Sequence, residues 1–232
     1  MAVIQSGAST NLMTVDANTK AAHIVPRPID PTTLGQYRFS VVTGTLAAAL
    51  AANAVVFSCR WSDATRLALI TRLRTRFLPL TLFTAATLDS HTSFDLFFGT
   101  TFSAAHTGGT QLTISGRNCK LRTSMGSSLF NDIRIATTAA LGGGTVTLDT
   151  QPLAQSLRKG NRVNPAAATE EVIMPASDGL NLDIDTGSGE YPVVLAANEG
   201  LVLRNRTVWP AAGTGILLVE MNWAEVLATE YA

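Results

Sequence analysis

The sequence predicts an all-β fold, a jelly-roll-like antiparallel β-sandwich with an extended N-terminal arm. Segments of β type recur at regular intervals after residue 36, with glycine-containing turns between them, as in sandwiches and barrels. Long amphipathic helical patterns are absent, which argues against the usual α/β enzyme folds. The length, 232 residues, is one that all-β sandwiches reach as a single domain.

The first 35 residues are predicted to form the arm, and residues 36–232 are predicted to form the sandwich. Three prolines within residues 26–31 exclude a helix interior and a central strand there. Apolar side chains near these prolines need cover, which favours an arm docked on a subunit surface over a floppy terminus. The arm residues expected to contact other subunits are Ile24, Val25, Pro26, Arg27, Pro28 and Ile29.

Residues 66–77 carry the clearest strand pattern, an alternation with a period of two that is typical of a half-buried strand. The face predicted to be buried comprises Leu67, Leu69, Thr71, Leu73, Thr75 and Phe77. The opposite face carries Arg72, Arg74 and Arg76. These arginines line either a solvated outer face or a docking strip for acidic residues of a neighbouring subunit, since Arg is enriched at interfaces. Binding of nucleic acid is a third interpretation, which no wider basic surplus supports.

Further strands and two short helices complete the predicted domain. The helices are predicted at residues 46–54, where a loop packed on the sheets fits equally well, and at residues 151–159. Residues 160–177 are predicted to form a long loop. The further strands are predicted at residues 37–42, 55–61, 94–102, 110–115, 133–138, 145–150, 180–185, 191–195, 201–206 and 216–226.

The charge content excludes several classes of protein. Seventeen Lys and Arg residues balance seventeen Asp and Glu residues, so a general nucleic-acid binder is not expected. No apolar run is long enough for a membrane helix, and no secretory signal pattern is present. Charged residues make up 15% of the chain, against roughly 25% in ordinary soluble proteins. A surface this poor in charge is unusual for a free monomer and favours a subunit of an assembly.

No residues form a recognisable catalytic, cofactor or metal site, and the protein is predicted not to be an enzyme. His23, His91 and His106 lack the spacing of metal ligands. Cys59 and Cys119 are interpreted as buried thiols, with a disulfide between them as the alternative. A β-sandwich hydrolase would need convergent carboxylates or a triad, and the sequence offers neither.

One acidic stretch resembles part of a calcium loop. Asp183, Asp185 and Glu190 are followed or separated by glycines, but further oxygen ligands and the spacing of the full motif are missing. Aspartate and glycine are also the residues that a turn between strands selects. A turn is therefore the favoured interpretation.

Several stretches carry a family resemblance. They are residues 15–22 (VDANTKAA), 27–28 (RP), 35–38 (GQYR), 120–129 (KLRTSMGSSL), 198–204 (NEGLVLR) and 223–226 (WAEV). The chain resembles virion structural proteins of tailed bacteriophages. The resemblance implies a β-sandwich that decorates or cements the head, and it brings no catalytic signature.

Together, these observations predict a non-enzymatic capsid decoration or cement protein that stabilises the head shell through its arm and contacts between subunits. The expected partners are the major capsid protein and copies of the chain itself, with a trimer as one candidate, and no cofactor, membrane or nucleic acid. The expected location is the virion, assembled in the host cytoplasm. The alternative is a tail, baseplate or fibre-associated protein that binds a host glycan through Trp61, Tyr191 and Trp209, although core packing is favoured for these aromatic residues.

Overall fold

The computed structural model describes residues 35–81, 83, 91–114, 119–159, 181–183 and 192–231. The predicted arm, the predicted loop at residues 160–177, and the acidic turn beyond Asp183 lie outside the described residues. All the described strands belong to the unit Pro31–Ala232.

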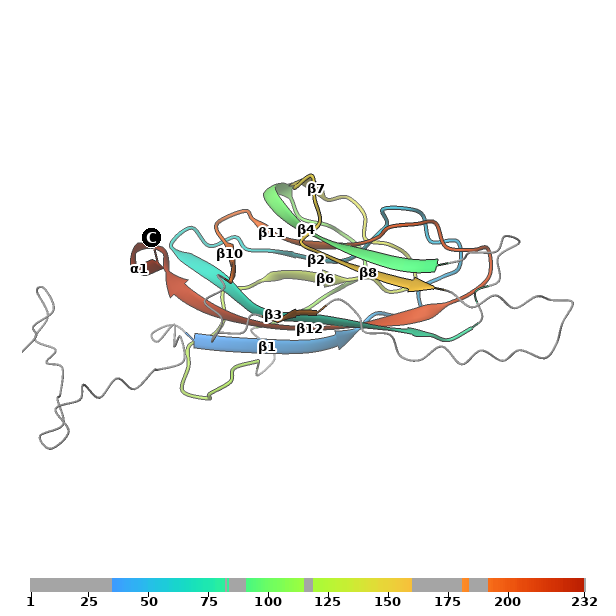
Figure 1. Ribbon diagram of the computed structural model, residues 1–232. Coiled ribbons are helices and arrows are strands. Elements are labelled where there is room, and N and C mark those ends of the chain that lie inside the picture. Colours follow the sequence, from blue (N-terminus) through green and yellow to red (C-terminus); the bar gives the residue numbers. More distant parts are fainter. Residues whose placement is uncertain are drawn as a thin grey trace, which may run out of the picture. The chain divides into compact units, whose positions relative to one another are not determined.

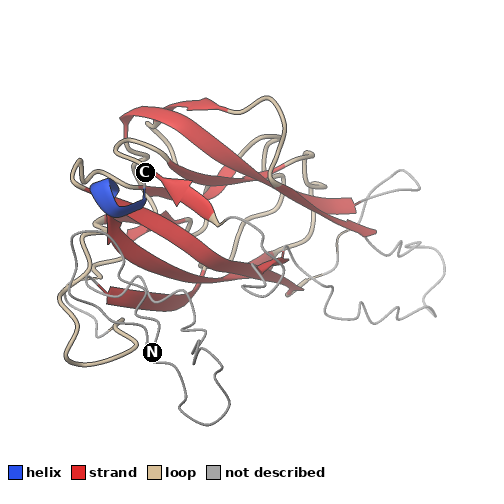
Figure 2. Ribbon diagram, turned by 60° about the vertical axis from the view of Figure 1, so that its left-hand side comes forward, coloured by secondary structure: helices blue, strands red, loops and turns tan. Residues whose placement is uncertain are grey.

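Two antiparallel sheets face each other across an apolar core (Figure 1). The first sheet contains, in spatial order, β1 (Gly35–Val42), β12 (Gly215–Leu227), β3 (Arg66–Pro79) and β10 (Val193–Leu195), with β9 (Asn181–Asp183) also paired to β3. The second sheet contains β5 (Thr110–Gln111), β6 (Asp132–Ile135), β2 (Val55–Arg60), β11 (Gly200–Asn205), β4 (His91–Ala104) and β7 (Thr145–Leu148), with β8 (Ala154–Lys159) also paired to β4. Within the described residues, the helix α1 (Ala228–Tyr231) is a single short turn near the C-terminus (Figure 2).

The strand order confirms the predicted jelly-roll-like sandwich. Strands β1, β2, β3 and β4 alternate between the sheets, and so do β11 and β12. The last two strands insert between the early ones, which gives the order β1-β12-β3 in one sheet and β2-β11-β4 in the other. This interleaving is the Greek-key arrangement of a jelly roll. Strands β5 and β6 extend the second sheet beyond β2.

Aromatic side chains form two groups within the core between the sheets. At one end, Tyr37 stacks on Trp223 with ring centroids 5.5 Å apart, and Phe130 packs edge-on against Trp61 at 5.3 Å. At the other end, Trp209 is the centre of a second aromatic group that contains Phe77, Phe83 and Phe94. Aromatic pairs in these geometries add about 0.5–1.5 kcal/mol each beyond the burial of their area.

Two of the predicted elements differ in the structure. Residues 151–159 do not form a helix, because Ala154–Lys159 pairs with β4 as strand β8. The backbone hydrogen bonds of that ladder override a weak local preference for helix. Residues 46–54 form the loop that was the alternative to a helix, and the loop includes residues with positive φ at Ala49 (57°) and Asn53 (60°).

The predicted faces of β3 are wrong for the residues before Thr71, because a β-bulge interrupts the alternation there. The register with β12 shifts by one residue at Thr71, since Asn222 lies opposite Arg72 and Trp223 lies opposite Ile70. A one-residue shift reverses which side chains face the core. Ala68 and Ile70 therefore join Leu73 and Phe77 in the core between the sheets. Leu67 and Leu69 lie instead on the outer face, in a second cluster with Val194, Ala224 and Val226.

Candidate functional site

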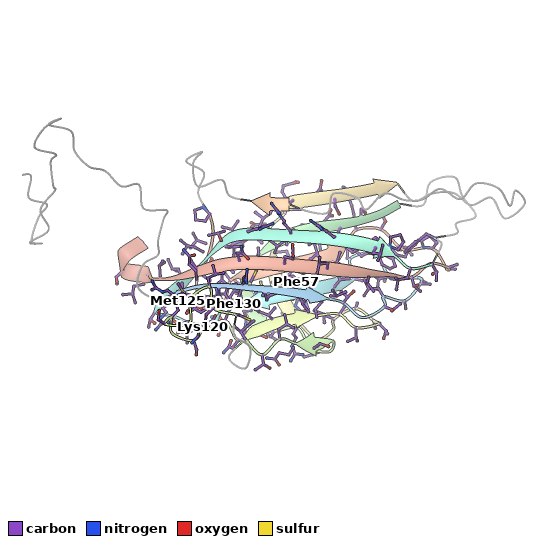
Figure 3. The ribbon with its side chains drawn as sticks, turned by 90° about the horizontal axis from the view of Figure 1, so that it is seen from below. Phe57, Lys120, Met125 and Phe130 are labelled. Atoms are coloured by element: carbon purple, nitrogen blue, oxygen red, sulfur yellow. The ribbon has the colours of Figure 1, made fainter. Side chains whose placement is uncertain are left out.

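The arginines of β3 lie on the outer face of the first sheet, where Figure 3 shows β3, β12 and β1 side by side. Arg72, Arg74 and Arg76 point outward because the residues between them, Leu73 and Thr75, are buried beneath the sheet. Arg76 is exposed, whereas Arg72 and Arg74 are half-buried. The period-two pattern therefore located these three side chains correctly on one face.

Cross-strand neighbours arrange this outer face in rows. One row contains Ser40, Glu220 and Arg74, and the next contains Arg38, Asn222 and Arg72. The strand β9 places Asp183 in register with Arg72. No ion pair joins Arg38, Arg76 or Glu220 to any other residue that the structure describes. The rows thus present both signs of charge, with arginine in excess.

A groove runs along the rows at the β1 side of the face. Its volume is about 490 Å³. The groove is lined by Arg38, Phe39, Ser40, Arg72, Cys119, Leu121, Glu220 and Asn222. The groove has more hydrogen-bond donors than its one carboxylate, that of Glu220, can accept. The donors are two guanidinium groups, an amide and a hydroxyl.

The same outer face becomes aliphatic toward the C-terminal end of β1. Val42 and Leu78 are 47% and 51% exposed, and Leu80, which follows the end of β3, is 48% exposed. Leu218 lies in register between Val42 and Arg76, and Ile216 lies opposite Leu78. We call Val42, Ile216, Leu218, Leu78 and Leu80 the aliphatic end. Contiguous exposed apolar side chains with a polar rim are typical of interaction surfaces.

The outer face of the second sheet is occupied by the protein's own side chains. Phe102 folds back against Gly99 and Gly200, where any β-carbon would collide with its ring. Arg204 lies over the ring of Phe97, 4.1 Å from its centroid, and Val202 is fully buried. The two outer faces therefore differ, and only the first sheet presents an open apolar surface among the described residues.

Residues 119–130, which we call the strap, border the groove and cover the outer edge of β1 (Figure 3). Arg38 donates its amide hydrogen to Cys119 O at 2.9 Å, and Leu121 donates to Gln36 O at 3.0 Å. Between these bonds, Lys120 forms an isolated antiparallel bridge with Tyr37. Residues 121–124 are exposed.

The far end of the strap is fixed by the buried carboxylate of Glu225. Oε1 of Glu225 accepts hydrogen bonds from Ser128 Oγ at 2.6 Å, Leu129 N at 3.0 Å and Trp223 Nε1 at 3.3 Å. Oε2 lies 3.6 Å from the guanidinium of Arg66. Phe130, which follows, is 1% exposed and packs against Trp61 and Trp223.

Burial controls the protonation of this cluster. It raises the pKa of Glu225 above its ordinary value, and the hydrogen bonds and Arg66 only partly oppose the effect. Burial, with the nearby Glu225 carboxylate, also raises the pKa of Tyr37 to about 12. Tyr37 keeps its proton and donates it to Gly126 O at 3.0 Å, which adds a third point of attachment for the strap.

A serine–histidine pair lies on the second sheet. Local sequence patterns do not predict it, because Ser58 and His106 are far apart in the chain. Ser58 Oγ and His106 Nδ1 are 2.8 Å apart. The side chains are 4% and 6% exposed, so no substrate reaches the hydroxyl. Burial lowers the pKa of His106, which favours a neutral ring in a structural hydrogen bond.

The two cysteines are buried thiols, which confirms the favoured interpretation over a disulfide. Burial raises the pKa of Cys59 to about 12, so this thiol is not a nucleophile near neutral pH. Within the described part of the chain, no three His, Cys, Asp or Glu residues gather as metal ligands. No helix among the described residues is long and apolar enough to cross a bilayer.

Other predicted contact residues lie outside the described residues, namely Ile24, Val25, Pro26, Arg27, Pro28 and Ile29. Of the aromatic residues considered for glycan stacking, Trp61 and Trp209 are 0% and 1% exposed and belong to the core. Tyr191 lies outside the described residues. A sugar therefore cannot stack on either tryptophan, and core packing accounts for both.

Comparisons with known proteins show weak structural similarity and no match to a known family. No family model matches the chain, and no curated protein matches it. Among solved structures, the chain is similar to the 60-mer BFDV capsid protein, with 8% sequence identity and a TM-score of 0.23. The similarity covers 83% of this chain and 91% of that chain. A TM-score this low does not establish a common fold, so the jelly-roll assignment rests on the strand order.

Proposed function

We propose that this protein is a non-enzymatic structural protein of a tailed-bacteriophage virion, and that it decorates or cements the capsid shell. In this proposal its partners are the major capsid protein and further copies of the chain, with a trimer as the first stoichiometry to test. It is assembled onto the head in the host cytoplasm and remains in the virion. The observation that carries the proposal is the open outer face of the first sheet.

The chemistry of that face suits a protein partner. The aliphatic end offers Val42, Leu78 and Leu80 for burial, and each fully buried aliphatic side chain contributes about 1.5–3 kcal/mol. Arg76 lies in the same row as Val42, and Arg38 lies two rows further along the same face. Arg pairs bidentately with carboxylates. The matching surface on the partner is therefore aliphatic with acidic residues at its rim.

The area of the face also favours a second point of attachment. Three strands about 4.8 Å apart and four rows about 7 Å apart span about 400 Å². A stable interface buries about 800 Å² on each partner. The face alone is too small for tight binding, and the N-terminal arm is the segment that we propose supplies the remaining contact, by extended pairing with a neighbouring subunit.

Two further observations support a role in an assembly. The low charge content leaves the subunit little self-repulsion to oppose close packing. The jelly roll is also a recurrent fold of capsid proteins, which is an analogy of fold and not a demonstration of function.

Cryo-electron microscopy of the virion that carries this chain tests the proposal. Density for the jelly roll repeated over the shell, with the outer face of the first sheet against the capsid, is the expected result. Density at the tail alone would overturn the decoration role. Absence of the chain from purified particles would overturn the virion role altogether.

A further inference from the structure

The groove between the strap and the outer face of the first sheet contains a row of hydrogen-bond donors. Arg38 on β1, Asn222 on β12 and Arg72 on β3 are neighbours across the sheet in this row, and all three line the groove. Neighbouring strands lie about 4.8 Å apart, so about 10 Å separates the α-carbons of the two arginines. Both arginine side chains are long enough to reach one ligand placed above Asn222.

Arg38 is the arginine best placed to hold an anion. Its side chain is exposed, and it forms no ion pair with any other residue in the described part of the chain. Arg72 has Asp183 in register on the side of β3 that faces away from β12. We therefore assign the main contact with an anion to Arg38, and the supporting hydrogen bonds to the Asn222 amide and the Ser40 hydroxyl at the same groove.

The charge of the groove favours an anion with a single negative charge. The charged side chains of its lining are Arg38, Arg72 and Glu220, which gives one positive charge in excess. Glu220 lies in the next row, about 7 Å further along the strands, and its carboxylate repels a doubly charged anion such as phosphate. A carboxylate carries one charge and accepts two parallel hydrogen bonds from a guanidinium group.

The size and the rim of the groove favour a peptide over a free ion. The volume of about 490 Å³ is in the range of sites that enclose whole organic ligands and exceeds what one carboxylate fills. At the rim, Leu121 of the strap is 46% exposed and lines the same groove. An aliphatic side chain next to the carboxylate would bury Leu121 and gain apolar contact.

The strap wall of the groove is already in place without a ligand. Arg38 N donates to Cys119 O at 2.9 Å, and Leu121 N donates to Gln36 O at 3.0 Å. The far end of the strap is held by the hydrogen bonds to Glu225 and by the buried ring of Phe130. A ligand that enters a preformed groove avoids the cost of ordering its walls.

We propose that this groove binds a short acidic segment of a partner protein. A glutamate or aspartate carboxylate of the segment lies on Arg38 and Asn222, and a neighbouring aliphatic side chain of the segment lies on Leu121. The assignment goes beyond the capsid role and does not depend on it, because binding of a peptide to the purified chain is measured without particles.

Fluorescence anisotropy with the purified full-length chain tests the proposal. The probe is a labelled pentapeptide with blocked ends, in which one glutamate is flanked by leucines. Saturable binding that weakens with added salt is expected, because the contact is partly electrostatic. The same peptide with glutamine in place of glutamate is expected to bind about tenfold more weakly or worse, and inorganic phosphate is expected not to displace the glutamate peptide at equal concentration.

Substitutions in the groove identify the side chains that hold the peptide. Arg38→Ala is expected to weaken binding about tenfold or more, and Arg38→Lys to weaken it less, since lysine keeps the charge but not the planar fork. Leu121→Ser is expected to weaken binding several-fold. Glu220→Gln is expected to tighten it, because the competing carboxylate is removed, which is a gain that a loss of folding cannot produce.

Arg206→Ala is the matched control. Arg206 follows β11 of the second sheet, its side chain is 50% exposed, and its removal costs the protein the same charge away from the groove. This variant is expected to bind the peptide as wild type does. Lack of saturable binding, equal binding of the glutamine peptide, or equal weakening by Arg38→Ala and Arg206→Ala would overturn the proposal. Displacement by phosphate at equal concentration would overturn the choice of a peptide and indicate a free anion instead.

Discussion

The structural role of Glu225 is not apparent from its position in the sequence. On strand β12, Glu225 lies on the same face as core residues such as Met221 and Trp223. It is 0% exposed and collects three hydrogen bonds on one oxygen. A buried charge is tolerated only where such partners compensate its desolvation.

The raised pKa of Glu225 predicts a pH-dependent stability. The folded state binds the proton more readily than the unfolded state, so the contribution to stability is present below the ordinary pKa and is lost as pH rises through the raised one. Among the described residues, the charge of Arg66 acts to lower the pKa of Glu225, and Glu225 in turn raises the pKa of Tyr37. Urea denaturation of wild type and Glu225→Gln from pH 4 to pH 8 should show the difference shifting in favour of the variant.

For one titrating group, the slope of that difference does not exceed about 1.4 kcal/mol per pH unit. Asp63 has a lowered pKa, but it is present in both proteins and cancels in the comparison. A difference between wild type and variant that stays constant with pH would contradict the assignment of the shift to Glu225.

Two glycines make a second prediction at this scale. A β-carbon at Gly200 would collide with the carbonyl oxygen of Cys59 on the neighbouring strand, whereas one at Gly142 would meet nothing within 4 Å. Gly200→Ala is expected to destabilise the fold by about 1–3 kcal/mol through overpacking. Gly142→Ala, the control, is expected to stay within about 0.5 kcal/mol of wild type in the same urea titrations. Equal stabilities for the two variants would contradict the close approach of β11 to β2.

At the scale of elements, strand β3 shows how one irregularity divides a surface. Before the bulge at Thr71, the outer face carries Leu67 and Leu69 in a buried apolar cluster. After the bulge, the same face carries the three arginines and then the exposed Leu78. The bulge thus places a covered end and an open end on one face of a continuous strand.

Substitutions in the aliphatic end and beside it test whether this part of the outer face contacts the capsid. Leu78→Asp and Arg76→Glu are each expected to weaken binding to capsid particles roughly tenfold or more, in proportion to their share of a small interface. Leu153→Asp is the control, because Leu153 is also exposed (39%) but precedes β8 of the second sheet. Co-sedimentation with particles measures the affinity, and equal binding by all three variants would contradict the assignment of this face.

At the scale of the whole molecule, the described core lies within the unit Pro31–Ala232. The core cluster draws its members from both sheets, from Tyr37 through Trp223. A protein arranged in this way is expected to fold without its arm and to use the arm for assembly.

Deletion of residues 1–31 tests this expectation. The truncated chain is expected to keep a thermal unfolding midpoint within a few degrees of the full chain, as for a change of about 1 kcal/mol or less. Its binding to capsid particles is expected to be lost, because the remaining face is too small for a stable interface. Calorimetry and co-sedimentation give the two readouts. Full binding by the truncated chain would contradict the role of the arm.

Much of the architecture could be predicted from local patterns. Alternation with a period of two located most of the strands, and the absence of helical periodicity predicted the all-β class. The outward placement of Arg72, Arg74 and Arg76 followed from the same alternation. These features are predictable because side-chain alternation is a property of each strand's own backbone.

The errors and omissions depend on contacts between distant segments. The bulge at Thr71 exists only in the register with β12, and residues 151–159 become a strand only because β4 pairs with them. The convergence of Glu225, Ser128 and Arg66 unites residues from three parts of the chain. Composition and alternation therefore defined a charge-poor sandwich. Tertiary pairing decided which face stays open and where the strap is anchored, because register and burial belong to pairs of segments and not to any one of them.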